Sequence, residues 1–90
     1  MTYVIVSPPR IDHGEGGREW DVTTPSGEWI ARIKAFGDYW PGDPNMSYGL
    51  ESPRYNEKEK GLRDGSVITL TWEHLDKALS ELENDVINGD

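Results

Sequence analysis

The chain contains a short apolar segment that leads directly into an amphipathic one, and this succession constrains the fold more than any other feature. Residues 67–71 (VITLT) are β-branched or apolar, which is typical of a buried strand. Beyond them, large apolar residues recur at spacings of three and four and form one narrow helical stripe: Trp72, Leu75, Leu79, Leu82 and Val86. We therefore predict a strand at Val67–Thr71 and a helix at Trp72–Ile87. A strand joined to a one-sided helix favours an α+β fold with the helix packed on a sheet.

The predicted helix carries signals at both ends. Thr71 stands at the N-cap position, where its hydroxyl can accept a hydrogen bond from a backbone N–H of the first turn. Glu73 suits the positive end of the helix dipole. Asn88 and Gly89 provide a stop.

Three further strands are predicted upstream. Tyr3–Val6 lies in an apolar, partly β-branched run that two prolines terminate. Glu19–Thr23 and Trp29–Phe36 flank Pro25-Ser26-Gly27, whose proline and glycine favour a tight turn, so these two strands form a hairpin. The sequence thus predicts an antiparallel sheet of about four strands, whose strand order stays open.

The apolar pattern selects a register for the hairpin. Placing Trp20 opposite Ala31 and Glu19 opposite Arg32 gathers the apolar side chains of both strands on one face. That face holds Trp20, Val22, Trp29, Ala31, Ile33 and Ala35. The opposite face then holds Asp21, Ile30, Arg32, Lys34 and Phe36, which form a second contact surface.

Two segments show no helix or strand period. Residues 10–18 (RIDHGEGGR) are rich in glycine and charge, which indicates a mobile connection. Residues 37–65 form a long irregular loop that is unusual in a compact domain unless it has a function. With 90 residues in total, we predict one small domain spanning residues 1–90.

Composition excludes several classes of function. The net charge of −8 disfavours direct binding to nucleic acid or to anionic lipid, because phosphate repels such a surface. The sequence has no cysteine, so thiolate catalysis and cysteine-bound zinc are excluded and a cytoplasmic location is favoured. No signal peptide or membrane span is predicted.

Candidate catalytic and metal sites are few. The HGEGG segment, residues 13–17, lacks the basic residue and the following helix of a phosphate-binding loop. Asp12, His13 and Glu15 offer metal-ligand atoms, but a glycine-rich loop does not position them. His74 falls on the solvent side of the predicted helix, and no nucleophile or carboxylate pair stands in a recognisable catalytic context. We predict no catalytic residue, no cofactor site and no metal site.

Two groups of residues are candidates for binding a partner. The terminal helix carries one lysine and the acidic residues Glu73, Asp76, Glu81, Glu83 and Asp85. These either dock on a basic surface, as a mimic of nucleic-acid phosphates, or serve only solubility. The second group is the aromatic set Tyr39, Trp40, Tyr48 and Tyr55. Its members either contact a partner or close the core of a small domain.

The functional hypothesis is a non-enzymatic protein-binding module that engages a larger protein or complex with a basic surface. Its most concrete version is an inhibitor of a nucleic-acid-handling complex. Small acidic domains of this kind are frequent among phage-encoded anti-defence proteins, including anti-CRISPRs, an analogy of size and charge alone. One alternative is a self-associating module, such as a homodimer through Ile30 and Phe36. The other is an enzyme or small-ligand binder that uses the His13 loop or the aromatic loop.

Overall fold

The computed structural model describes residues 2–52 and 67–89, and in them it confirms the α+β class. Within these described ranges, six strands and one α-helix follow each other, with a 3-10 turn, η1, at Gly14–Gly16. The elements are β1 (Val4–Ile5), β2 (Ile11–Asp12), β3 (Arg18–Thr23), β4 (Trp29–Ala35), β5 (Ser47–Glu51), β6 (Val67–Thr71) and the helix α2 (Trp72–Asn88). The observed β1 is two residues shorter than the predicted strand Tyr3–Val6.

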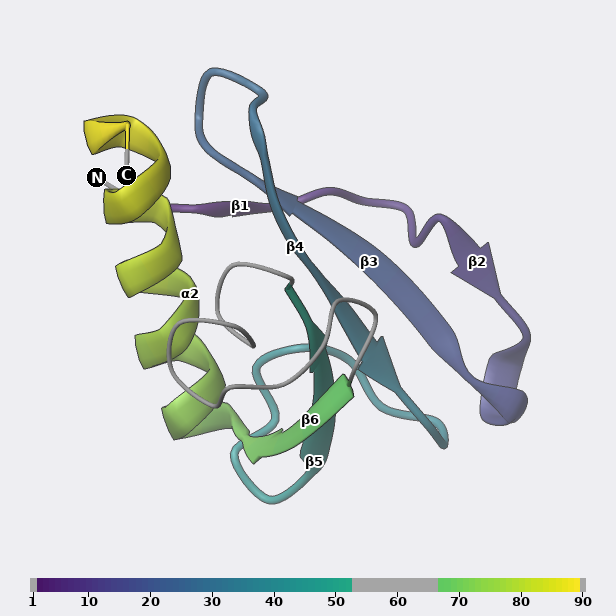
Figure 1. Cartoon of the computed structure of the whole chain (residues 1–90). Helices are drawn as coiled ribbons and strands as arrows, with labels where there is room; N and C mark the ends of the chain where they lie inside the picture. Colours follow the sequence, from purple (N-terminus) through teal and green to yellow (C-terminus); the bar gives the residue numbers. More distant parts are fainter. Residues whose placement is uncertain (1, 53–66, 90) are drawn as a thin grey trace.

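All described strands belong to one antiparallel sheet with the order β1-β3-β4-β5-β6 (Figure 1). The strands β3 to β6 are neighbours in sequence order, so this part of the sheet is a meander. β2 also pairs with β3, at the end of β3 opposite to that covered by β1. Because β6 leads directly into α2, the helix turns back along one face of the sheet (Figure 1).

The face of the sheet that packs against α2, here called the inner face, contains the core. Apart from Ile30 in β4, its buried side chains come from alternate positions of β3, β4 and β5, as the period of two requires. The helix contributes Leu75, Leu79 and Leu82, each no more than 2% exposed, so the predicted stripe is confirmed. Gly89 ends the helix with a φ of 78°, in the left-handed region, as expected. Thr71 is the N-cap, but its hydroxyl bonds the His74 Nδ1 at 2.8 Å and not a backbone N–H.

The predicted hairpin is present, but its register was wrong. Trp20 pairs with Ile33 and not with Ala31, and the pairing shifts by one residue between Val22 and Thr23. The extra residue is Ile30, which is 4% exposed and belongs to the core. Trp29, by contrast, is 44% exposed and its Nε1 donates to Asp21 on the face away from the helix. Ile30 therefore cannot contribute to the second contact surface, and Phe36 alone remains of the proposed dimer contact.

Two segments expected to be irregular contain regular structure. The 37–65 region includes β5, which pairs with both β4 and β6; the remainder beyond residue 52 lies outside the described residues. The glycine-rich segment 10–18 forms β2 and η1. Asp12 holds it by accepting hydrogen bonds from the Gly14 N–H at 2.8 Å and the Arg18 Nε at 3.0 Å. An acidic side chain that bonds its own backbone two residues on thus stabilises a turn that composition alone suggested to be mobile.

Candidate functional site

Trp40 combines exposure with fixed packing. The indole is 51% exposed, yet its ring meets the ring of Trp20 edge to face with 5.6 Å between centroids. The Arg18 guanidinium carbon lies 4.8 Å from the Trp40 ring centroid, a cation–π contact. Trp20 is 1% exposed, so it anchors Trp40 to the core. One part of the Trp40 ring therefore packs on the core, as the core-closing interpretation predicted, and the rest faces solvent.

Arg18 connects the aromatic residues to the acidic ones around them. Its side chain is 11% exposed and lies 3.0 Å from Asp12 and 3.5 Å from Asp38. The Asp38 side chain is 70% exposed, so this carboxylate stands beside Trp40 in solvent. The pKa of Asp12 is lowered, first by the hydrogen bond from the Gly14 N–H and then by the Arg18 charge. The exposed ring thus has an acidic rim.

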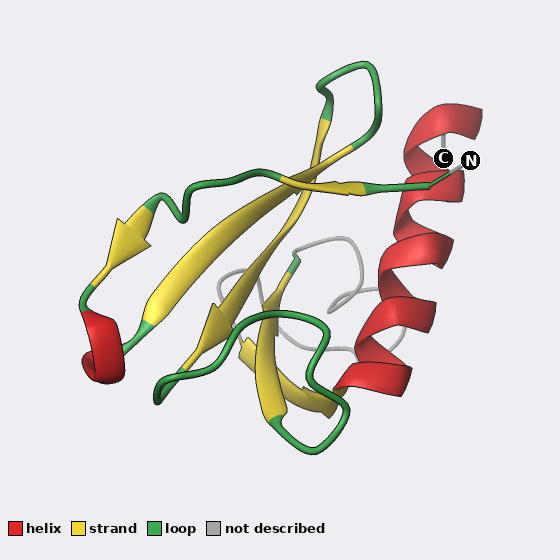
Figure 2. Ribbon diagram, turned by 180° about the vertical axis from the view of Figure 1, so that it is seen from behind, coloured by secondary structure: helices red, strands yellow, loops and turns green. Residues whose placement is uncertain are grey.

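Tyr48 is a core residue and not a contact residue. It is 1% exposed, and burial raises the pKa of its hydroxyl. The hydroxyl donates to the carbonyl oxygens of Trp40 at 3.0 Å and Asp43 at 2.9 Å. Its ring meets those of Tyr39 and Trp72 edge to face. Tyr48 therefore attaches the 36–46 loop to the start of α2, and Figure 2 shows this loop passing beside the first turn of the helix.

The other members of the aromatic set differ in position. Tyr39 is half-buried, and its hydroxyl donates to the Ser47 carbonyl oxygen. Tyr55 lies outside the described residues. A residue that the sequence analysis did not single out, Met46, is 36% exposed on the same loop as Trp40. Beyond Phe36, the exposed large apolar residues of this loop are therefore Trp40 and Met46.

The acidic helix is less uniform than its sequence suggests. Glu73, Asp76 and Glu81 are exposed, whereas Asp85 is half-buried. Glu83 is 3% exposed and cannot contact a partner, which contradicts the prediction for this residue. Lys77 stands four residues from both Glu73 and Glu81, so these three side chains are neighbours on the helix surface. The lysine interrupts the row of negative charge that a phosphate mimic needs.

The buried carboxylate of Glu83 leads to a prediction about stability. Within the described part of the chain its Oε2 accepts no hydrogen bond. A buried charge without such compensation costs free energy, so Glu83→Gln is expected to raise the free energy of unfolding by about 1 kcal/mol at pH 7. Urea denaturation followed by circular dichroism measures this change. Glu81→Gln, on the exposed face, is the matched control and should change stability by less than about 0.5 kcal/mol. A clear loss of stability in Glu83→Gln would contradict the prediction.

Tyr3 joins the N-terminal segment to the helix. Its hydroxyl donates to Asp76 Oδ1, and its ring packs against the core. Burial, followed by this hydrogen bond and the nearby carboxylates, raises the pKa of Tyr3 above its ordinary value.

The raised pKa predicts an alkaline limit to stability. The unfolded chain releases the Tyr3 proton near pH ~10, whereas the folded chain keeps it to higher pH. The stability contributed by the protonated hydroxyl is therefore complete below about pH 10 and declines as the pH rises further. Tyr3→Phe should reduce this decline, leaving the share that comes from Tyr48. The decline in stability is measured from the urea concentrations at the unfolding midpoint at pH 8 and pH 11. Equal declines in Tyr3→Phe and in the parent would refute the assignment of this decline to Tyr3.

The face of the sheet away from α2, here called the outer face, carries an ion-pair network. Its cations are Arg10, Arg32 and Lys34, and its anions are Glu19, Asp21 and Glu51. The shortest pair, Arg32 Nε to Asp21 Oδ1, measures 3.2 Å, and the others lie between 3.6 and 4.0 Å. Charges on this face are balanced, in contrast to the acidic helix.

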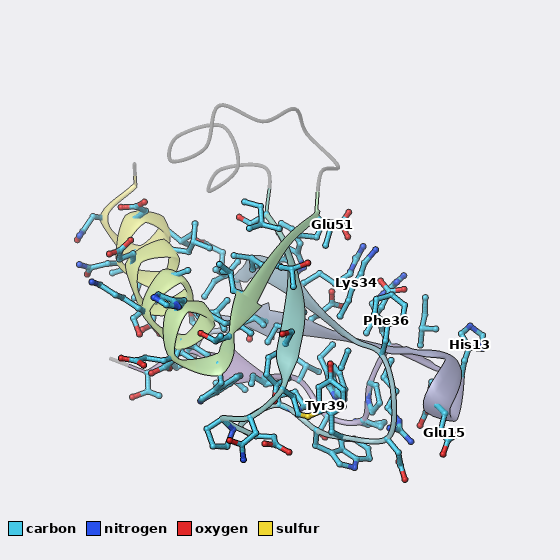
Figure 3. All side chains as sticks on the ribbon, turned by 90° about the horizontal axis from the view of Figure 1, so that it is seen from below. His13, Glu15, Lys34, Phe36, Tyr39 and Glu51 are labelled. Atoms are coloured by element: carbon cyan, nitrogen blue, oxygen red, sulfur yellow. The ribbon has the colours of Figure 1, made fainter. Side chains whose placement is uncertain are left out.

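A hollow of about 230 Å³ lies on the outer face where β2, η1, β3 and β4 meet. Its walls include Ile11 and Phe36, and Gly16 and Gly17 contribute backbone. Its polar side chains are those of His13, Arg18, Glu19 and Lys34. Figure 3 shows Lys34 and Phe36 on one side of β4 and Tyr39 on the other. The hollow and the Trp40 surface therefore lie on different faces of the sheet.

The remaining sequence-derived candidates do not converge. His13 lines the hollow, whereas His74 lies on the exposed side of α2 and bonds Thr71. In residues 2–52 and 67–89 there is no group of three metal-ligating side chains. Nor does this part of the chain contain a helix that is long and apolar enough to cross a membrane.

Comparison with known proteins adds no relative: no family model, curated protein or solved structure matches this chain.

Proposed function

We propose that the chain is a non-enzymatic protein-binding module that docks on a larger protein through the Trp40 surface. This surface is centred on Trp40 and on Asp38, which is joined to it through Arg18. Met46 is exposed on the same loop, and Glu73 and Asp76 are exposed on α2, the helix that Tyr48 joins to this loop. Tyr48 brings the loop and the helix together, because its hydroxyl bonds the Trp40 carbonyl and its ring packs on Trp72.

The single observation that carries the proposal is the half-exposed, immobilised ring of Trp40. Tryptophan is enriched among the residues that contribute most to protein–protein affinity. A ring already held between Trp20 and Arg18 loses little conformational freedom on binding, so less of the interaction energy is spent on ordering it. Docking led by a preorganised aromatic side chain is therefore better supported than docking led by charge.

The acidic rim indicates what kind of partner fits. Asp38, Glu73 and Asp76 would favour an apolar hollow bordered by lysine or arginine, and the net charge of −8 would speed the encounter with such a surface. The most concrete version of the proposal remains an inhibitor that covers a nucleic-acid-binding surface in the cytoplasm. Since Lys77 interrupts the acidic row, we assign the carboxylates to selectivity and not to mimicry of a phosphate backbone.

The test is affinity capture from nuclease-treated lysate of the native host with four tagged forms of the full chain. The parent and Trp29→Ser should recover the same basic protein, because Trp29 is comparably exposed on the outer face. Trp40→Ser should lose it while keeping its far-UV circular dichroism. Elution in rising salt should release the partner earlier from a Glu73→Gln/Asp76→Asn double variant. Equal recovery by the parent and Trp40→Ser would refute the proposal.

A further inference from the structure

The outer-face hollow has the size of a site for one small ring. Its volume of about 230 Å³ exceeds the ~150 Å³ of an apolar cavity known to hold benzene. Ile11 and Phe36 supply apolar walls, and the Phe36 side chain is 68% exposed, the most of any large apolar residue in the described ranges. A ligand ring placed there would bury part of the exposed Phe36 surface, which is favourable.

Gly17 shapes the hollow by the absence of a side chain. Its φ is 130°, a conformation that other residues rarely adopt, and a Cβ there would lie 3.4 Å from Cδ1 and Cε1 of Phe36. Gly17 also bonds His13 through its backbone: its carbonyl accepts from the His13 N–H at 2.9 Å. The glycine therefore fixes η1 beside β4 and lets the Phe36 ring approach the backbone closely.

Lys34 offers hydrogen-bond donors but little net charge. Its Nζ lies 3.6 Å from Glu51 Oε2 and 4.0 Å from Glu19 Oε1, so both carboxylates neutralise it. Both distances are too long for a hydrogen bond, and no other described residue accepts a hydrogen bond from the ammonium group. The polar rim of the hollow thus has free N–H groups in a nearly neutral setting.

We infer from this combination that the hollow binds a small uncharged ring compound that carries a hydrogen-bond acceptor. The ring would pack between Ile11 and Phe36, and the acceptor would take a hydrogen bond from Lys34. An anionic ligand would meet the Glu19 carboxylate, and a cationic ligand would meet Lys34 and Arg18. Both cations are already paired with carboxylates, Arg18 with Asp12 and Asp38 and Lys34 with Glu19 and Glu51. The site therefore complements neither an anionic nor a cationic ligand, whereas an uncharged carbonyl oxygen can accept a hydrogen bond from Lys34. This site shares Arg18 with the packing of Trp40, but its ligand contacts, Phe36 and Lys34, are not part of the Trp40 surface, so the two proposals are tested by different variants.

The experiment titrates the intact, ¹⁵N-labelled chain with three probes that share one ring and differ in charge: phenylacetamide, phenylacetate and phenethylammonium. Phenylacetamide is expected to produce saturable shifts of the Gly16 and Gly17 amide signals, with a dissociation constant below that of either charged probe. Shifts that do not saturate with any probe, or tighter binding of a charged probe, would overturn the inference.

Three variants locate the binding. Phe36→Ala removes an exposed wall, so the shifts at Gly16 and Gly17 should disappear while the rest of the spectrum is retained. Lys34→Met keeps most of the side-chain length but removes the donors, and it should weaken phenylacetamide by about 2- to 10-fold, the value of one hydrogen bond. Ile87→Ala, at an exposed apolar position on α2, is the matched control and should bind as the parent does. Undiminished binding by Phe36→Ala would refute the site.

Discussion

Trp20→Ala is expected to lower the free energy of unfolding by about 3–5 kcal/mol, the largest effect of any single substitution proposed for this chain. Trp20 is 1% exposed and is the largest of the fully buried side chains, so its truncation removes apolar contacts and leaves a cavity. A domain of 90 residues has a total stability of about 5–13 kcal/mol. The variant should therefore be close to unfolded at 37 °C, and Trp40 should lose its support at the same time.

Urea denaturation followed by circular dichroism measures this loss, with Trp29→Ala as the matched control. Trp29 is 44% exposed and contributes one hydrogen bond to Asp21 at 3.2 Å. Its truncation should cost about 1 kcal/mol or less. A larger effect at Trp29 than at Trp20 would mean that the two rings had been assigned to the wrong faces of the hairpin.

The parts of the fold that the sequence predicted well are those with a long, regular apolar period. The stripe of α2 repeats over four turns, and the glycine at position 89 has the left-handed conformation that ends helices. The hairpin turn was also located, because proline fixes its own φ and glycine accepts the positive φ of 96° that Gly27 adopts. The register of the hairpin was not predicted correctly, because the extra residue Ile30 shifts the alternation of side chains between the two faces of the sheet. Nothing in the composition marks such a bulge.

The strand β5 was missed for a physical reason that the structure makes clear. Its sequence, SYGLE, contains a glycine and no β-branched residue, which lowers its strand propensity. A Cβ at Gly49 would lie 2.9 Å from Val67 Cγ1, so this position needs a glycine because neighbouring strands crowd it. Gly49 lowers the strand propensity of this segment, yet the same glycine allows β5 to pack beside its neighbours.

The candidate site was predictable only in outline. The alternation of Tyr48 and Leu50 would have assigned both to the core had the strand been recognised. Glu83 lies one residue from Leu82 and four from Leu79, a position next to the buried stripe, so helical geometry contained a signal for its burial. The exposure of Trp40 and the outer-face hollow depend on contacts between segments distant in sequence, which local patterns do not encode.

Tyr48→Phe is expected to have the second largest effect, a loss of about 1–3 kcal/mol. The substitution keeps the buried ring and its contacts with Tyr39 and Trp72, and removes only the hydroxyl. The carbonyl oxygens of Trp40 and Asp43, which accept from the hydroxyl at 3.0 and 2.9 Å, then keep only the longer bonds from the Asp43 N–H at 3.4 Å and the Met46 N–H at 3.5 Å. Weakening the hydrogen bonding of two part-buried carbonyl groups at once costs about as much as one or two average hydrogen bonds contribute.

The same substitution separates a positioning role for Tyr48 from a contact role. Because the hydroxyl joins both ends of the Trp40–Asp43 turn, we expect faster amide exchange in residues 38–46 than in the parent, while α2 keeps its protection. Partner recovery through Trp40 should fall, although Tyr48 itself is buried and touches no partner. Tyr39→Phe, which removes a single hydrogen bond to the Ser47 carbonyl, is the control and should loosen the loop less. If exchange in residues 38–46 is unchanged in Tyr48→Phe, Trp40 is held by its ring contacts with Trp20 and Arg18 alone.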